Sequence, residues 1–256
     1  MRHTTPLHAL VTGGGSGIGA EIAKVLVAAG MRVTITGRRL EVLQALAPQY
    51  PGRMQAVVAD VADAAAVASA FAQAKAHFGP VQVLVNNAGQ AQSAPFAKTD
   101  DALWQQMLAV NLTGTYHCTQ AAVPDMLAAG WGRIVNIAST AGLVGYAYVA
   151  AYCAAKHGVV GLTRALALEY ARKGITVNAV CPGYTETDLL RESIAHVVAQ
   201  TGRTEAQARE AFCAGNPQGR VVQPQEVADA VRWLCGDAAA SVTGQSIAVS
   251  GGEVMN

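Results

Sequence analysis

Short apolar runs alternate with longer stretches whose apolar residues recur at helical spacing along most of the chain. The short runs are rich in Val, Ile and Ala and end at turn-forming residues, which favours strands buried on both faces. Seven strands are predicted, over residues 9–12, 32–36, 54–59, 81–86, 133–138, 175–180 and 246–249. Six helices are predicted between them, over residues 17–29, 40–47, 64–77, 101–129, 152–173 and 225–235.

This alternation predicts parallel strands that are joined by crossover helices. We therefore expect an α/β fold, a single-domain Rossmann-like doubly wound parallel sheet of about seven strands with helices on both faces, over residues 1–256. One long interval, residues 184–222, breaks the alternation and holds a further predicted helix over residues 188–200. Because insertions at the carboxyl ends of such strands often cover ligands, we expect this interval to be a substrate lid.

Composition and charge narrow the classes of function. Hydrophobic residues make up 52% of the 256 residues and charged residues only 14%, which favours a well-filled core over disorder. The formal net charge is +1 and the basic residues are scattered, so neither nucleic acid nor a membrane surface is an expected partner. A small-molecule substrate is predicted instead.

Cellular location and metal content are also constrained. Residues 1–10 lack the apolar segment of a secretory signal, and no run of about 18 apolar residues occurs, so we expect a cytoplasmic protein without a membrane span. The five cysteines are far apart and form no CxxC pair. Reduced thiols are therefore predicted, with neither disulfides nor a metal site.

A glycine-rich turn follows the first predicted strand and leads into an amphipathic helix. It includes Gly13, Ser16, Gly17, Ile18 and Gly19. Glycines let the backbone approach a pyrophosphate closely, and the first amides of the helix stabilise its negative charge. With a strand before it and a helix after it, this turn is typical of a dinucleotide site.

The end of the second predicted strand bears on which dinucleotide is bound. An acidic residue here would bind the ribose 2'-hydroxyl of NAD, but the chain has Gly37, Arg38 and Arg39. An arginine can instead pair with the 2'-phosphate of NADP. In the alternative interpretation Arg38 stacks on adenine and Arg39 is solvated. The sequence favours NADP and leaves NAD possible.

Three polar side chains suggest acid–base chemistry. Tyr152 and Lys156 are four residues apart in a strong helix-forming segment, so they share one helix face. We expect the lysine ammonium to lower the tyrosine pKa from about 10, which would make Tyr152 a general acid or base. Ser139 directly follows the fifth predicted strand, and its hydroxyl can orient a carbonyl and stabilise negative charge on oxygen.

Taken singly, each of these features also has a structural explanation, but together they resemble the classical short-chain dehydrogenase/reductase family. The resemblance extends from about residue 9 to residue 252. It rests on Thr12-Gly13-x3-Gly17-x-Gly19, Asn86-Asn87-Ala88-Gly89, Asn111, Ser139, Tyr152-x3-Lys156 and Pro182-Gly183. It implies an oxidoreductase that transfers a hydride between a nicotinamide and a ketone or secondary alcohol, in a homotetramer.

The resemblance also implies a role for each matching residue. Tyr152 would exchange a proton with the substrate oxygen, and Lys156 would activate it and hold the nicotinamide ribose. Ser139 would position the carbonyl, and Asn111 would anchor a water that relays protons. The implied cofactor-binding residues are Gly13, Ser16, Gly17, Ile18, Gly19, Arg38, Arg39, Asp60, Val61, Asn87, Ala88, Gly89, Tyr152, Lys156, Pro182, Gly183, Tyr184 and Thr187.

One departure affects cofactor choice. Many NADP-preferring members carry a basic residue inside the glycine motif, where this chain has Ser16. Arg38 would then supply nearly all of the 2'-phosphate recognition.

The predicted substrate residues are mainly apolar or aromatic, which fits a neutral ketone or hydroxyl on an acyl or cyclic body. They are Ser139, Gln90, Leu143, Tyr146 and Tyr148, and residues 141–142 and 184–190 are expected to line the same pocket. The chain most resembles 3-oxoacyl-thioester reductases and 3-hydroxyacyl-CoA dehydrogenases. The uncharged segment 128–131, where a carrier-docking basic patch would lie, favours a CoA ester or a small free ketone.

Two other functions stay open. One is a dehydrogenase or reductase of a free cyclic or aromatic alcohol or ketone. The other is a nucleotide-binding module without chemistry, although such modules usually lose the tyrosine or lysine that this chain retains.

Overall fold

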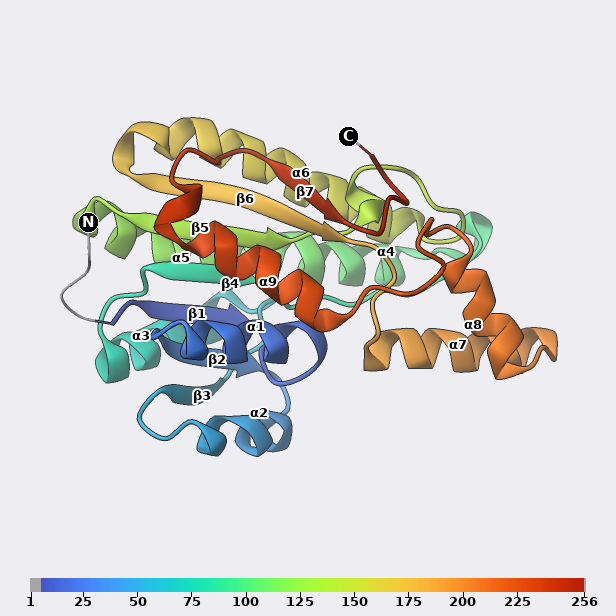
Figure 1. The fold of residues 1–256 in the computed structure, drawn as a ribbon, viewed down its shortest axis with the longest axis horizontal. Coiled ribbons are helices and arrows are strands. Elements are labelled where there is room, and N and C mark those ends of the chain that lie inside the picture. Colours follow the sequence, from blue (N-terminus) through green and yellow to red (C-terminus); the bar gives the residue numbers. More distant parts are fainter. Residues whose placement is uncertain (1–5, 256) are drawn as a thin grey trace.

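The computed structural model describes residues 6–255, so half of the segment examined for a secretory signal, residues 1–5, lies outside the described residues. Its strands are β1 (His8–Thr12), β2 (Arg32–Gly37), β3 (Met54–Val58), β4 (Val83–Asn86), β5 (Gly132–Ile137), β6 (Ile175–Pro182) and β7 (Ser246–Val249). All pair in parallel, in the order β3-β2-β1-β4-β5-β6-β7 (Figure 1). The predicted seven-stranded parallel sheet is confirmed.

Helices cover both faces of this sheet (Figure 1). One face carries α1 (Gly17–Ala28), α2 (Leu40–Leu46) and α9 (Pro224–Cys235), and the other carries α3 (Ala64–Phe78), α4 (Asp101–Leu108), α5 (Gly114–Ala129) and α6 (Ala150–Tyr170). Neighbouring strand residues point to opposite faces: Val11 packs with Ile22 of α1, and Leu10 packs with Phe71 of α3. This two-sided burial explains why the strands are continuous apolar runs.

The strand order places a crevice at the carboxyl ends of β1 and β4. The chain builds β2 and β3 outward from β1, then returns to β4 on the other side of β1. At such a reversal the following loops diverge and leave room for a ligand. The crevice is fixed across its base, because the backbone amides of Asn87 and Ala88 each donate to Thr12 Oγ1 over 2.9 Å.

The helix predicted over residues 101–129 is not a continuous α-helix. A π-helical turn, Ala109–Thr113, separates α4 from α5. Within it, the Asn111 side chain donates to the carbonyl of Met107, 2.9 Å away, which is the carbonyl that an α-helix would use at this position. Single π turns of this kind occur frequently at functional sites.

The long interval over residues 184–222 forms α7 (Asp188–Thr201) and α8 (Glu205–Cys213), which lie beyond the carboxyl ends of the strands (Figure 1). A separate apolar cluster, including Leu190, Ile194 and Ala208, joins the two helices. A parallel bridge between Thr185 and Val222 closes the base of this segment. We call residues 184–222 the lid segment; that it acts as a lid stays a prediction.

Candidate active site

A cleft of about 1040 Å³ follows the carboxyl ends of the strands, from the glycine-rich turn to the inner side of α7. Every residue predicted from the sequence to be catalytic or to bind the cofactor lines this cleft. These residues are Gly13, Ser16, Gly17, Ile18, Gly19, Arg38, Arg39, Asp60, Val61, Asn87, Ala88, Gly89, Asn111, Ser139, Tyr152, Lys156, Pro182, Gly183, Tyr184 and Thr187.

The glycine-rich turn has the shape and polarity that a pyrophosphate needs. A Cβ atom on Gly19 would lie 2.2 Å from the carbonyl oxygen of Gly13, so only glycine fits this approach. Ser16 caps α1 without a side-chain hydrogen bond, and the first turn holds no acidic residue. The amides at the start of α1 therefore stay available to an anion in the cleft.

Two arginines follow β2 at the far end of the cleft. Neither Arg38 nor Arg39 forms an ion pair within 4.0 Å in the described part of the chain. Asp60, on the neighbouring loop, accepts a hydrogen bond from the amide of Ala62 over 3.0 Å. This end of the cleft thus offers two guanidinium groups to a phosphate.

The predicted acid–base residues meet near the middle of the cleft. Lys156 is 4% exposed, and its Nζ donates to the carbonyl of Ile137 over 2.8 Å. The same Nζ lies 5.6 Å from the centre of the Tyr152 ring, as expected for neighbours on one helix face. The Tyr152 phenol is hydrogen-bonded to the Ser139 hydroxyl, which also accepts from the amide of Ala141 over 3.1 Å.

The electrostatics differ from the expectation that Lys156 lowers the tyrosine pKa. Burial raises the pKa of Tyr152 to about 12, and the hydrogen bond from Ser139 opposes this rise. Burial lowers the pKa of Lys156 to about 8. Desolvation is the largest cause of both pKa shifts, because the charged form of each group is disfavoured in an apolar site. A protonated phenol is the stable form at neutral pH.

Asn111 is held rigidly by the main chain of the β4–α4 loop. Its amide group donates to the carbonyl of Gln90 over 2.9 Å, and its Oδ1 accepts from the amide of Gln90 over 3.2 Å. A Cβ atom on Gly89 would lie 2.9 Å from this Oδ1 and 3.5 Å from Lys156 Nζ. The glycine therefore lets Asn111 and Lys156 lie close together, while the predicted role of Asn111 with a relay water stays untested.

Four of the five predicted substrate residues line the cleft: Gln90, Ser139, Tyr146 and Tyr148. The side-chain amide nitrogen of Gln90 is buried and has no hydrogen-bond partner among the described residues, so it remains a free donor. Tyr148 has a φ of 67°, a strained value for a residue with a side chain, of the kind that is common at ligand sites.

Leu143, the fifth predicted substrate residue, is not among the residues that line the cleft, so its role stays a prediction. Its side chain packs against a cluster that includes Val159 and Val160 of α6. The short 3-10 turn Thr140–Gly142 accounts for this, because it rotates the chain after β5 and turns Leu143 toward the core.

The first part of the lid segment, predicted to line the pocket over residues 184–190, contributes Tyr184, Leu189 and Leu190 to the cleft. The sequence did not identify the further lid residues that face the cleft, which are Glu192, Ser193, His196 and Val197 of α7, with Phe212 of α8. Their spacing of three and four residues marks one face of a helix and would have separated these positions from the outer face.

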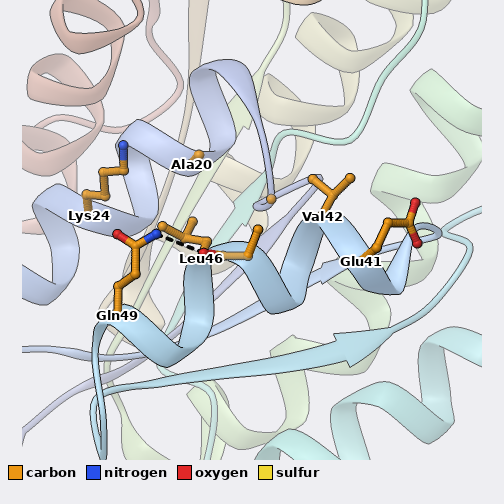
Figure 2. A pocket seen from close by; sticks show the side chains of 8 residues that line it. Ala20, Lys24, Glu41, Val42, Leu46 and Gln49 are labelled. Carbon is orange, nitrogen blue, oxygen red and sulfur yellow. Dashed lines mark hydrogen bonds between the residues drawn. The ribbon is translucent and has the colours of Figure 1, made fainter.

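A second, shallower hollow of about 400 Å³ lies between α1 and α2, behind the glycine-rich turn (Figure 2). Lys24, Glu41 and Gln49 edge it, and Val42 and Leu46 form its apolar side. The side-chain amide of Gln49 donates a hydrogen bond to the carbonyl of Ala45 over 2.8 Å. The residues that line this hollow include no nucleophile paired with an acid or a base. The large cleft is therefore the candidate active site.

The chain was compared with known proteins. A family model described as short chain dehydrogenase matches residues 7–197. A Streptomyces coelicolor protein provisionally named a ketoacyl reductase is 43% identical, over 95% of each chain. A D-beta-hydroxybutyrate dehydrogenase of Rhizobium meliloti is 36% identical, over 95% of this chain and 97% of that one. The crystal structure of a single-substitution variant of the actinorhodin polyketide ketoreductase with NADPH superimposes with a TM-score of 0.93, at 42% identity and 97% coverage of both chains.

The chain belongs to the short chain dehydrogenase family. The enzyme is an NAD(P)-dependent oxidoreductase that acts on ketone or hydroxyl groups, which confirms the predicted class of reaction. No helix among residues 6–255 is long and apolar enough to cross a membrane.

Proposed function

We propose that this enzyme is an NADPH-dependent reductase of the 3-keto group of a 3-oxoacyl thioester. The observation that carries the proposal is the meeting of Ser139, Tyr152 and Lys156 in one cleft that continues into a turn shaped for pyrophosphate. The relatives named above are, by name, a ketoacyl reductase, a polyketide ketoreductase and a D-beta-hydroxybutyrate dehydrogenase. A 3-oxoacyl group joins the keto group of the first two names to the oxygenated β-carbon of the third, which supports this substrate class.

Each proposed catalytic residue has a task that its surroundings favour. Tyr152, protonated at neutral pH, donates its proton to the ketone oxygen as negative charge develops there. Ser139 donates a hydrogen bond to the same oxygen and holds the carbonyl in line. When bound, the reduced nicotinamide supplies the hydride. Lys156 holds the nicotinamide ribose and restores the proton of Tyr152, and Asn111 fixes the loop beside it.

The preference for NADPH rests on the end of β2. An NAD-binding site needs an acceptor for the ribose 2'-hydroxyl, but the residues after β2 are Arg38 and Arg39, without an acid. Both guanidinium groups line the cleft without an ion-pair partner among residues 6–255. A 2'-phosphate would pair with Arg38 in a charge-assisted hydrogen bond.

A free cyclic or aromatic ketone is the second candidate substrate. Three tyrosines, Tyr146, Tyr148 and Tyr184, line the substrate end of the cleft, and aromatic rings pack well against a cyclic body.

Initial rates with NADPH and NADH, measured against acetoacetyl-CoA and a panel of cyclic and aromatic ketones, test these proposals. We expect the highest kcat/KM with NADPH and acetoacetyl-CoA. Inactivity on every thioester with activity on a cyclic ketone would replace the first substrate with the second, and a strong preference for NADH would overturn the role of Arg38.

We also propose a homotetramer. On the described chain, Leu168 of α6 is 84% exposed and β7 is the edge of the sheet, so apolar surface and an open strand edge remain for neighbouring subunits. Size-exclusion chromatography with light scattering should give a mass about four times the 26.3 kDa of one chain. A monomer would contradict this proposal.

A further inference from the structure

The segment after β7 folds back toward the substrate end of the cleft. Gly251 and Gly252 have φ values of 64° and 94°, which turn the chain sharply. The turn is closed by hydrogen bonds from the amide of Glu253 to the carbonyl of Ser250 and from the amide of Val254 to the Ser250 hydroxyl. Glu253 is thereby held beside the loops that surround the substrate.

The Glu253 carboxylate forms a short hydrogen bond with a wall of the cleft. The Tyr146 phenol donates to Glu253 Oε1 over 2.5 Å, and the Thr140 hydroxyl lies 3.0 Å from the phenol oxygen. A phenol has a single proton, so when it donates to the carboxylate its oxygen can accept from Thr140. Tyr146 lines the cleft and Glu253 lies behind it.

The other oxygen of Glu253 faces the start of the lid segment. A Cβ atom on Gly183 would lie 2.7 Å from Glu253 Oε2, so a side chain at this position would displace the carboxylate. Among the described residues, no basic side chain forms an ion pair with Glu253. A partly buried carboxylate without a cation depends on its hydrogen bonds, and here the phenol is the main donor.

We propose that Glu253 is a positioning residue that holds Tyr146 and thereby sets the fit of the substrate body in the cleft. The inference rests on the proposed ketone reduction. Tyr146 reaches the substrate directly, and Glu253, 107 residues further along the chain, acts through it. Burial and, after it, the hydrogen bond to Glu253 raise the pKa of Tyr146, so the phenol stays protonated and keeps donating across the working pH range.

Steady-state kinetics of Glu253→Gln, Tyr146→Phe and the double variant test this role. Loss of a charge-assisted hydrogen bond of about 1.5 kcal/mol predicts a rise of roughly tenfold in the KM for the ketone in each single variant. Because both changes break the same contact, the double variant should show nearly the same rise rather than the product of the two. The KM for NADPH should change by less than about twofold, because the hydrogen bond that both variants remove is made by Tyr146, a predicted substrate residue.

A matched control is Glu210→Gln, the same chemical change at an exposed position of α8. Glu253→Asp, which keeps the charge but is shorter, should recover part of the lost affinity. The positioning role would be overturned if the rise in the KM for the ketone in the double variant equalled the product of the two single rises. It would also be overturned if the KM for the ketone and the KM for NADPH rose in parallel. In either case an active wild-type enzyme would still support the proposed function. A wild-type enzyme that reduces no ketone would overturn both. Thermal melts of all variants identify any loss of folding.

Discussion

The two ends of the active-site cleft are built in different ways. The cofactor end is formed by the first two strand–helix–strand units, and its contacts are mostly between backbone groups, as where Gly19 meets Gly13. The substrate end gathers side chains from segments far apart in the sequence, such as Gln90, Tyr146 and Glu253. Close backbone contacts at the cofactor end suit the binding of a dinucleotide. The side chains at the substrate end can change without disturbing the sheet.

The two ends of the cleft should therefore respond differently to substitution. Substitutions at the cofactor end should alter the loop and the dinucleotide affinity together, because the contacts that they change involve the backbone. Substitutions at the substrate end should alter turnover or substrate affinity and leave dinucleotide binding nearly intact. The predictions below test this separation.

The largest effect is expected for Tyr152→Phe. The phenyl ring keeps the packing beside Lys156 but cannot donate a proton to the ketone oxygen, so kcat should fall by about 10³-fold or more. The Kd for NADPH, measured by its fluorescence, should stay within roughly threefold of the wild-type value. Tyr116→Phe, the same change at an exposed position of α5, is the control. A kcat within about tenfold of wild type would contradict the role of Tyr152.

Gly19→Ala should produce the largest effect at the other end of the cleft. The added Cβ would lie 2.2 Å from the Gly13 carbonyl and 2.4 Å from Asn87 Nδ2, so the turn must shift. Overpacking of this kind costs about 1–3 kcal/mol, and we expect the affinity for NADPH to fall by up to roughly 100-fold.

Gly161→Ala is the matched control for this glycine. Gly161 lies in α6 with nothing within 4 Å of the new Cβ, so alanine should leave stability unchanged or raise it slightly. Isothermal titration with NADPH and thermal melts measure both outcomes. Unchanged NADPH affinity in Gly19→Ala would show that the turn does not depend on close backbone contact.

The same difference explains how much the sequence predicted. The cofactor end follows from local patterns, because the strand, the glycine turn and the helix of each unit are contiguous, and all predicted cofactor residues line the cleft. The sheet and its seven strands were predicted for the same reason. The π turn at Asn111 was not predicted; there the Asn111 side chain donates to the Met107 carbonyl of the same helix and also to the carbonyl of Gln90, in a loop far away in the sequence.

The substrate end was predicted less completely because its members meet only in the fold. Leu143 was predicted to contact the substrate, but after a short 3-10 turn its half-buried side chain packs against the cluster that includes Val159 and Val160. Helix α8 was missed although Thr204 and Gln207 form a capping box that marks its start. Glu253 follows the last strand, and the rule that ligands bind at carboxyl ends would have drawn attention to it.

Arg38→Ala tests whether a single side chain at the cofactor end contributes to NADPH affinity. We expect the KM for NADPH to rise by roughly tenfold, the loss of about 1.5 kcal/mol from a charged hydrogen bond, while the KM for NADH hardly changes. Arg39→Ala is the matched comparison, because its neighbouring guanidinium also lines the cleft. Equal effects on both dinucleotides would indicate that Arg38 contacts adenine instead of the 2'-phosphate.

The smallest effect is the dependence of ketone reduction on pH. Lys156, with a pKa of about 8, loses its proton as the pH rises through that value, whereas Tyr152, with a pKa of about 12, stays protonated. If the lysine ammonium restores the tyrosine proton, kcat at about pH 8 should be roughly half of its value below about pH 7. A rate that does not fall until well above about pH 10 would assign no such role to Lys156.

The loss of the Lys156 proton should raise protein stability, whereas it should lower kcat. The pKa of Lys156 falls from 10.5 in the unfolded chain to about 8 in the folded one, so between these values the unfolded chain binds more protons. The contribution of Lys156 to the free energy of unfolding therefore rises with pH across this window. The free energy of unfolding is measured for wild type and for Lys156→Met at about pH 7 and at about pH 9. The change between the two pH values that wild type shows and Lys156→Met lacks is the contribution of Lys156. A rate that declines while this contribution rises separates the chemical role of the ammonium from a loss of folding.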